Sequence, residues 1–160
     1  MEKYKALAEQ LKRKYSKGPD SGIFTDGGAS PNPGPGGWGF VYVDNNEFIN
    51  CKSGSDKETT NNRMELSALI NAVKFIGENK IEDLTIYSDS QLCINTINQW
   101  AKGWEKNNWK RKTGPIKNLE LVKELYYSFH ELKNIKLQWV PAHSGWLWNE
   151  FVDSIANFTE

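Results

Sequence analysis

The hydrophobic pattern of this chain changes once, near Asn62, and that change limits the folds open to it. Before Asn62, apolar residues form short runs separated by turn-forming residues, which predicts three antiparallel strands. After it, apolar residues recur at helical spacing and alternate with two more short apolar runs. This order predicts an α/β fold with a five-stranded mixed sheet flanked by helices in three layers, in which strands 4 and 5 run parallel to strand 1.

The predicted strands cover residues 23–26, 38–43, 47–52, 84–87 and 135–140. The segment from Gly27 to Gly37 holds five Gly and three Pro, so we expect it to be a loop. Asp44-Asn45-Asn46 separates the second and third strands and is typical of a hairpin turn.

Helices are predicted over residues 3–17, 62–77, 92–97, 121–132 and 148–156. The first is basic and amphipathic and ends at Gly18-Pro19-Asp20. We expect it to form an appendage (1–20) before one domain (21–160), because 160 residues suit one domain with an independent core.

Charge and cysteine content exclude several classes of protein. The 20 basic and 20 acidic residues balance, but residues 100–123 carry seven basic against two acidic side chains and residues 1–17 carry six against two. Cys51 and Cys93 lie outside any CxxC pair, which argues against a disulfide framework, a zinc site and redox work. No apolar run approaches the ~18 residues of a membrane span, so we expect a soluble cytoplasmic protein without a membrane partner.

Four acidic residues stand where separate predicted elements can converge. Asp26 and Asp89 each follow a predicted strand, and sites in α/β sheets form at the carboxyl ends of parallel strands. Taken singly, Asp26 suits a turn and Asp89 a helix cap. Glu65 suits a capping pair with Asn62. Asp153 is harder to explain, because an unpaired acid beside an apolar helix face is costly.

Taken together, these four carboxylates indicate a metal site. Acids gathered in one cleft repel one another, and divalent cations are the usual compensation. Oxygen ligands without a His or Cys cluster favour Mg²⁺ or Mn²⁺ over zinc. Two such ions ~3.5 to ~4 Å apart clamp both oxygens of an in-line phosphoryl displacement, so the sequence predicts phosphodiester hydrolysis.

Longer strings of residues carry a resemblance to a known family. The strings are Thr25-Asp26-Gly27, Asn32-Pro33-Gly34-Pro35-Gly36-Gly37-Trp38-Gly39, Thr60-Asn61-Asn62-Arg63-Met64-Glu65-Leu66, Tyr87-Ser88-Asp89-Ser90-Gln91, Trp100-Ala101-Lys102-Gly103-Trp104, Trp109-Lys110, Trp139-Val140-Pro141-Ala142-His143-Ser144-Gly145, Asn149-Glu150 and Asp153. From about Ile23 to Asn157, the chain resembles the type 1 ribonucleases H. The resemblance implies the ribonuclease H-like three-layer fold.

The resemblance also implies an activity. Asp26, Glu65, Asp89 and Asp153 match the acids that hold two Mg²⁺ ions, with Mn²⁺ as a substitute, and activate a water that attacks the RNA strand of an RNA/DNA hybrid. The expected endonuclease products carry 5′-phosphate and 3′-hydroxyl ends. His143 matches a loop histidine that assists water activation, proton transfer or product release, and a His can exchange protons near neutral pH. We expect a monomer without an obligatory protein partner.

Substrate contacts follow from the same resemblance. Asn32, Asn61 and Gln91, with backbone groups near Gly27 and Gly28, are similar to the family's set that contacts the minor groove, where 2′-hydroxyls distinguish RNA from DNA. Asn32 before Pro33 also suits a plain turn. Thr60 and Asn118 resemble members of a pocket that grips a DNA phosphate.

Residues 100–114 resemble the basic handle of bacterial and animal members, which is absent from some retroviral ones. Lysines among aromatic residues suit a nucleic-acid groove, and we expect Trp100, Trp104, Lys106 and Lys110 to contact substrate. With a handle built in, the chain should bind hybrid without a separate hybrid-binding module. The alternative for Trp104 and Trp109 is a place in the core.

Several features depart from the family pattern. Ala142 stands where Gly is common and should stiffen the loop of His143, and Ser154 follows the last Asp where an acid or Arg is common. Trp146 and Trp148 add bulk just after His143. The N-terminal helix has no family counterpart and either adds nonspecific nucleic-acid affinity or, as we prefer, is a plain solvated helix.

Three alternative functions stay open. The chain could be an integrase- or resolvase-like DNA nuclease of the same superfamily, a binding module with a dead site, or the C-terminal part of a polymerase-linked protein. The Asn-Asn-Arg-Met-Glu string and the handle tryptophans favour hybrids over DNA duplexes. All four acids are present, which argues against a dead site.

Overall fold

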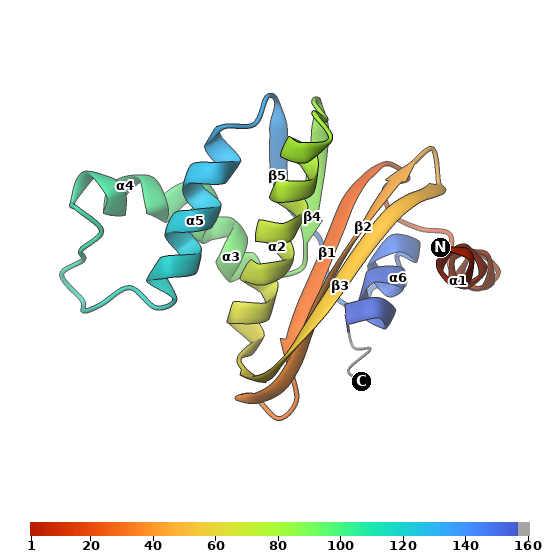
Figure 1. Cartoon of the computed structure of the whole chain (residues 1–160), viewed down its shortest axis with the longest axis horizontal. Coiled ribbons are helices and arrows are strands. Elements are labelled where there is room, and N and C mark those ends of the chain that lie inside the picture. Colours follow the sequence, from red (N-terminus) through yellow and green to blue (C-terminus); the bar gives the residue numbers. More distant parts are fainter. Residues whose placement is uncertain (157–160) are drawn as a thin grey trace.

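Five strands form one mixed sheet in the order β3-β2-β1-β4-β5 (Figure 1). β1 pairs antiparallel with β2 and parallel with β4, and β5 runs parallel to β4. The computed structural model describes residues 1–156, and its strands are β1 (Gly22–Ala29), β2 (Gly34–Asp44), β3 (Glu47–Thr59), β4 (Leu84–Ser88) and β5 (Ile135–Trp139). The predicted fold class and strand directions are confirmed. The predicted domain end at 160 and the end of the resemblance at Asn157 lie outside the described residues.

The helices cover both faces of the sheet, because successive strand residues point to opposite faces. Ile23 packs into a buried cluster with α2 (Asn61–Glu78) and α5 (Leu119–His130), whereas Phe24 packs with α6 (Leu147–Ala156) on the other face. Figure 1 shows α2 and α5 on one side of the sheet and α6 on the other. These two clusters make the three layers expected from the sequence.

The prediction of a loop from Gly27 to Gly37 was wrong. β1 continues to Ala29 and β2 begins at Gly34, with Gly27 paired to Trp38 and Gly28 to Gly37. The glycines serve close packing here, because a Cβ at Gly27 would lie 2.4 Å from the carbonyl oxygen of Met64 in α2. Only residues 30–33 connect the two strands.

The helix α1 (Glu2–Lys12) ends at Lys12 and not at residue 17 as predicted. It packs beside α6, where Ala8 is 2% exposed and joins the apolar cluster of that face. Figure 1 shows α1 next to α6 at the edge of the molecule. The apolar side of α1 is therefore packed, while most of its other residues are exposed.

The predicted helix over 92–97 is longer and irregular. α3 (Gln91–Asn95) runs into a π-helical turn, η1 (Thr96–Trp100), and then into α4 (Ala101–Lys106). The first half of the predicted handle is thus helical, and its second half is irregular up to α5. π-helix occurs mostly as single turns within α-helices, and such turns are frequent at functional sites.

The hairpin between β2 and β3 is confirmed, with Asn45 and Asn46 at positive φ of 49° and 65°.

Across residues 1–156, none of the helices is long and apolar enough to pass through a lipid bilayer.

Candidate active site

Asp26 and Asp89 lie side by side at one edge of the sheet. Thr25 of β1 pairs with Ser88 of β4 in parallel, so Asp26, which continues β1, and Asp89, which directly follows β4, lie at the same level. Ser90, and not Asp89, caps α3, because its Oγ accepts a hydrogen bond from the Cys93 amide at 3.2 Å. The Asp89 carboxylate is therefore not used as a helix cap.

Glu65, the fifth residue of α2, reaches the same place from near the start of that helix. Thr60 caps this helix by accepting a hydrogen bond from the Arg63 amide at 3.2 Å, so the alternative pairing of Asn62 with Glu65 is absent. The close approach of α2 to Gly27 brings the Glu65 carboxylate next to β1. Glu65 is 9% exposed.

Four carboxylates and one imidazole line a cleft that we call the acid cleft (Asp26, Glu65, Asp89, Asp153 and His143). One carboxylate oxygen from each of Asp26, Glu65 and Asp89 lies within 4.8 Å of the others. Asp153 of α6 lines the same cleft and shares a hydrogen bond with the Asp26 carboxyl group. Four elements, β1, α2, the β4 end and α6, therefore supply one acid each.

Crowding and burial change the proton affinity of the acid cleft. Burial raises the pKa of Asp26 from 3.8 to about 9, and the charges of Asp89 and Asp153 add to this rise. Burial also raises the pKa of Glu65 well above its ordinary value, with further contributions from Asp89 and Asp26. Among the described residues, the buried Oε1 of Glu65 has no hydrogen-bond partner. An unsatisfied carboxylate oxygen among other carboxylates fits a hard divalent cation.

His143 lies at the mouth of the acid cleft, on the loop between β5 and α6. Its side chain is exposed and lines the cleft with Asp26, Asp89 and Asp153. Its backbone is in the left-handed region at a φ of 50°. The start of this loop is fixed because the Pro141 carbonyl accepts hydrogen bonds from Ser144 Oγ and Asn149 Nδ2, both at 3.2 Å.

Part of the predicted minor-groove set adjoins the acid cleft. Gly27, Gly28 and Asn61 line it next to Glu65. The Asn61 side-chain oxygen accepts a hydrogen bond from the Ala29 amide at 2.7 Å, and the Asn61 amide donates to Asn32 Oδ1 at 3.1 Å. Asn32 thus braces Asn61 without lining the cleft. Gln91 is exposed at the start of α3.

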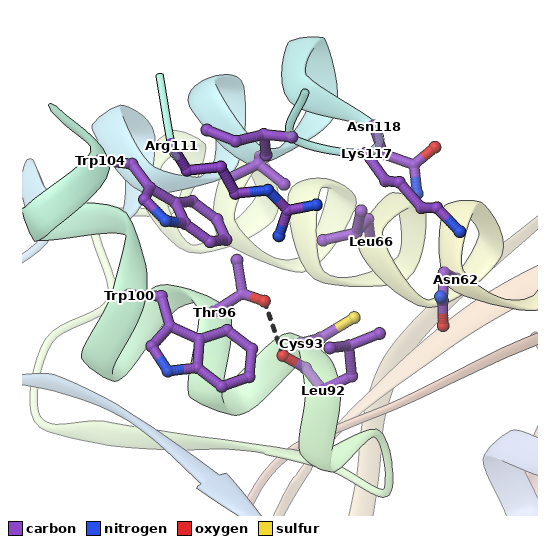
Figure 2. Close-up of a pocket in the computed structure, with 12 residues that line it drawn as sticks. Asn62, Leu66, Leu92, Cys93, Thr96, Trp100, Trp104, Arg111, Lys117 and Asn118 are labelled. Atoms are coloured by element: carbon purple, nitrogen blue, oxygen red, sulfur yellow. Dashed lines mark hydrogen bonds between the residues drawn. The ribbon is translucent and has the colours of Figure 1, made fainter. Parts of the chain in front are cut away.

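A second depression, the tryptophan groove, lies between α2, α3–α4 and the segment before α5. Its lining includes Trp100, Trp104, Arg111, Lys117, Asn62 and Asn118. Figure 2 shows the two indole rings at one end and Asn62, Lys117 and Asn118 at the other. Trp100 is 41% exposed, and the Arg111 guanidinium lies 5.9 Å from the centre of the Trp104 ring.

Three other handle residues lie outside the tryptophan groove. Lys106 and Lys110 are exposed but do not line it. Trp109 packs against Tyr126 and donates from Nε1 to the Tyr127 hydroxyl at 3.1 Å. Trp109 therefore follows the alternative of a packing role, in which it attaches the handle to α5.

Arg63 was missed as a site residue, although it lies within the quoted Asn-Asn-Arg-Met-Glu string. Its guanidinium donates to Asn118 Oδ1 and Glu120 Oε2, both at 3.1 Å, while its amide donates to Thr60. Thr60 and Asn118 are therefore brought together through Arg63. Arg111 and Lys117 were also missed, and the basic excess in residues 100–123 was their only signal.

Comparison with known proteins decides the family. The model of the RNase H family matches residues 19–159, which is most of the chain. The chain belongs to the RNase H family. Ribonuclease H of Ehrlichia ruminantium (strain Gardel) is 45% identical over 138 residues, covering 84% of this chain and 90% of the relative. Ribonuclease H of Treponema denticola is 39% identical over 149 residues, covering 84% and 92%.

Solved structures of RNase H proteins share the fold. RNase H1 from Halobacterium salinarum NRC-1 superposes with a TM-score of 0.66 at 23% identity, covering 84% of this chain and 92% of that one. LC11-RNase H1, solved in complex with an RNA/DNA hybrid, gives a TM-score of 0.62 at 25% identity, covering 84% and 95%. The resemblance drawn from the sequence is confirmed. As an RNase H, this chain is an enzyme of an endoribonuclease family.

Proposed function

We propose that this RNase H hydrolyses the RNA strand of RNA/DNA hybrids with two divalent cations in the acid cleft. The observation that carries the proposal is the meeting of three carboxylate oxygens within 4.8 Å, from Asp26, Glu65 and Asp89. The hybrid bound to LC11-RNase H1, a protein of the same family, supports the choice of substrate. We assign the activity to residues 21–160.

The residues present fit a pair of Mg²⁺ ions. Asp26, Glu65, Asp89 and Asp153 would hold them, since all four offer oxygen ligands. Burial, and then the negative charges of Asp89 and Asp153, raise the pKa of Asp26, and a cation would offset those charges. Mn²⁺, which accepts the same ligands, should substitute. When bound, the ions supply charge neutralisation at the scissile phosphate and a water of lowered pKa.

The resemblance to the type 1 ribonucleases H gives the direction that we propose for the reaction. Water attacks the phosphorus and the bond from phosphorus to the 3′-oxygen breaks, which leaves a 5′-phosphate on one product and a 3′-hydroxyl on the other. The 3′-oxygen takes up a proton as it leaves. His143, exposed at the mouth of the cleft, is placed to exchange this proton with solvent or to assist release of the product.

The two depressions suit the two strands of a hybrid. Gly27, Gly28 and Asn61 beside the acids would contact 2′-hydroxyls of the RNA strand, with Asn32 bracing Asn61 and Gln91 on the neighbouring helix.

The tryptophan groove would take the DNA strand. Trp100 and Trp104 pack on deoxyriboses, and Asn118 with Thr60 and Arg63 grips a phosphate. Lys106 and Lys110 add exposed positive charge nearby. Since both strands are held by one chain, we propose a monomer without an obligatory protein partner. The free thiols of Cys51 and Cys93 suit a reducing cytoplasm.

The test is cleavage of labelled RNA/DNA, DNA/DNA and RNA/RNA duplexes in Mg²⁺, with EDTA as the control. We expect cleavage of the RNA strand of the hybrid alone, and labelled ends that match 5′-phosphate and 3′-hydroxyl standards. Preferential cleavage of DNA/DNA would favour a DNA nuclease of the same superfamily and contradict the proposal.

A further inference from the structure

The first 18 residues lie outside the family match, which begins at residue 19. They contain α1 and a segment that we call the strap, residues 13–18. α1 is anchored on the α6 face of the sheet, where Ala8 is buried and the Tyr4 ring stacks on Phe48 at 6.3 Å between centroids. The strap therefore leaves α1 from a fixed point.

The strap pairs with the loop that carries His143. Lys17 forms a parallel bridge with Trp146, and the Leu147 amide donates to the Lys17 carbonyl at 3.0 Å. Gly18 has a φ of +97°, and a Cβ there would lie 2.9 Å from Trp146 Cβ. This turn thus requires glycine both for its backbone angle and for its packing on Trp146.

Tyr15 of the strap covers the next part of the loop. A Cβ at Gly145 would lie 3.7 Å from Tyr15 Cδ1 and 3.9 Å from Cε1, so the ring lies beside Gly145, on the side where a side chain would project. Tyr15 is partly buried and packs against the apolar cluster that contains Leu147. The ring therefore connects the cluster under α6 to the loop.

The chain is held in place on both sides of His143. On one side, Ser144 and Asn149 hold the Pro141 carbonyl. On the other, the strap holds residues 145–147. The bulk at Trp146, a departure from the family pattern, gives the strap its surface. Trp148 has another task, because it is 1% exposed and donates from Nε1 to Asn46 Oδ1 at 2.8 Å.

We propose that the strap is a positioning element that holds the His143 loop over the acid cleft, with Tyr15 as its main side chain. Tyr15 acts through His143 and touches no substrate. The proposal rests on the proposed function for its effect on cleavage, because the role of His143 is part of that function. The other part of the proposal, that the strap restrains residues 143–147, depends only on the contacts between the strap and this loop.

The experiment compares Tyr15→Ala with Tyr4→Ala in the full chain. Both substitutions remove a tyrosine that packs on the same apolar cluster, and the ring of Tyr15 also lies beside Gly145 of the loop. Hydrogen exchange of residues 141–147 is measured first. Tyr15→Ala should speed exchange of the Leu147 amide about tenfold and Tyr4→Ala should leave it unchanged, because local opening depends on local contacts. Tyr15→Phe should behave like wild type.

Single-turnover cleavage of a hybrid is measured next, with and without His143→Ala. Tyr15→Ala should slow the wild-type rate about fivefold with unchanged KM, and by less than about twofold when His143 is absent, since coupled residues are not additive. Tyr4→Ala should have no effect on the rate. If Tyr15→Ala fails to fold, Gly18→Ala tests the strap at a second point, because it disturbs the packing of Gly18 on Trp146.

The outcomes separate the two proposals. Unchanged exchange in the loop of Tyr15→Ala would overturn the strap whatever the enzyme cleaves. Faster exchange with an equal loss of rate in the His143→Ala background would overturn the positioning of His143. A wild-type protein that cleaves no hybrid would contradict the proposed function and leave the exchange result to decide the strap.

Discussion

The acid cleft and the tryptophan groove, which we propose to bind one substrate, are built in opposite ways. The acid cleft gathers charge in a buried place, where Glu65 keeps an oxygen without a hydrogen-bond partner among the described residues. The tryptophan groove presents exposed aromatic faces and cations, such as Trp100 and Arg111. Catalysis requires charged groups to be held in fixed positions even where they repel one another. Binding a nucleic-acid strand requires only exposed aromatic and basic side chains, whose solvation in the free protein costs little free energy.

The largest expected effect comes from removing one charge of the acid cleft. Asp89→Asn should slow hybrid cleavage by at least about 10³-fold, since charge stabilisation at a metal site is worth several kcal/mol. The same substitution should raise the melting temperature in EDTA, because one repulsive charge is gone. Cleavage rates and thermal melts check both effects.

Glu78→Gln is the matched control for this substitution, since Glu78 is exposed at the far end of the helix that carries Glu65. It should change neither value. Asp89→Asn protein that cuts hybrid at the wild-type rate would remove the acid cleft from catalysis.

Dependence on pH and metal should separate the two regions next. The pKa of Asp26 is raised from 3.8 to about 9, so its protonated form favours the fold, and this contribution is lost as pH rises through that range. The pKa of Glu65 moves in the same direction. The protein in EDTA should therefore melt at a lower temperature at about pH 8.5 than at about pH 6.

Millimolar Mg²⁺ should reverse this loss, and its effect on the melting temperature should grow between those two pH values, because protons and metal compete for the same oxygens. Calorimetric melts with and without Mg²⁺ measure it. If the rise in melting temperature caused by Mg²⁺ became smaller as pH rises, a cluster of carboxylates with raised pKa values would be contradicted.

A smaller effect is expected in the tryptophan groove. Trp104→Ala should raise KM for hybrid about tenfold with little change in kcat, because aromatic packing on nucleic acid is worth about 1–3 kcal/mol. Trp109→Phe is the matched control, since Trp109 packs on Tyr126 and lies outside the groove. Trp109→Phe should lower the melting temperature and leave KM unchanged. If Trp109→Phe raised KM and Trp104→Ala changed only the melting temperature, Trp109 would be the binding residue and Trp104 the packing residue.

The smallest effect concerns salt. Arg111→Gln and Lys117→Gln should each reduce the slope of log affinity against log salt by about 1, and replacing Lys106 and Lys110 should flatten it further. Binding titrations at several salt concentrations measure the slope. Lys133→Gln, at an exposed ion pair with Glu82, should leave it unaltered. Equal slopes in all variants would remove the handle from the binding surface.

The sequence predicted what local chemistry determines and missed what depends on distant contacts. The sequence correctly placed Asp89 directly after a strand and Asp26 level with it, because an acid after a β run needs no knowledge of the fold, but β1 continues past Asp26 to Ala29. The glycines from Gly27 to Gly37 were assigned to a loop, yet most lie in paired strands where α2 must approach.

Other errors have the same origin. Arg63 becomes a site residue only because Asn118 lies 55 positions away in sequence but within hydrogen-bond distance in space. The packing of α1 and the strap likewise depends on α6, at the other end of the chain. Residue type and spacing cannot report such contacts, whereas the family strings could still indicate the acids.

The most direct test of the central claim is anomalous diffraction from crystals of this protein grown with Mn²⁺ and a hybrid whose scissile linkage resists hydrolysis. The account predicts two peaks ~3.5 to ~4 Å apart, between Asp26, Glu65, Asp89 and Asp153 and next to a phosphate of the RNA strand. Peaks elsewhere on the molecule, with none among these acids, would contradict it.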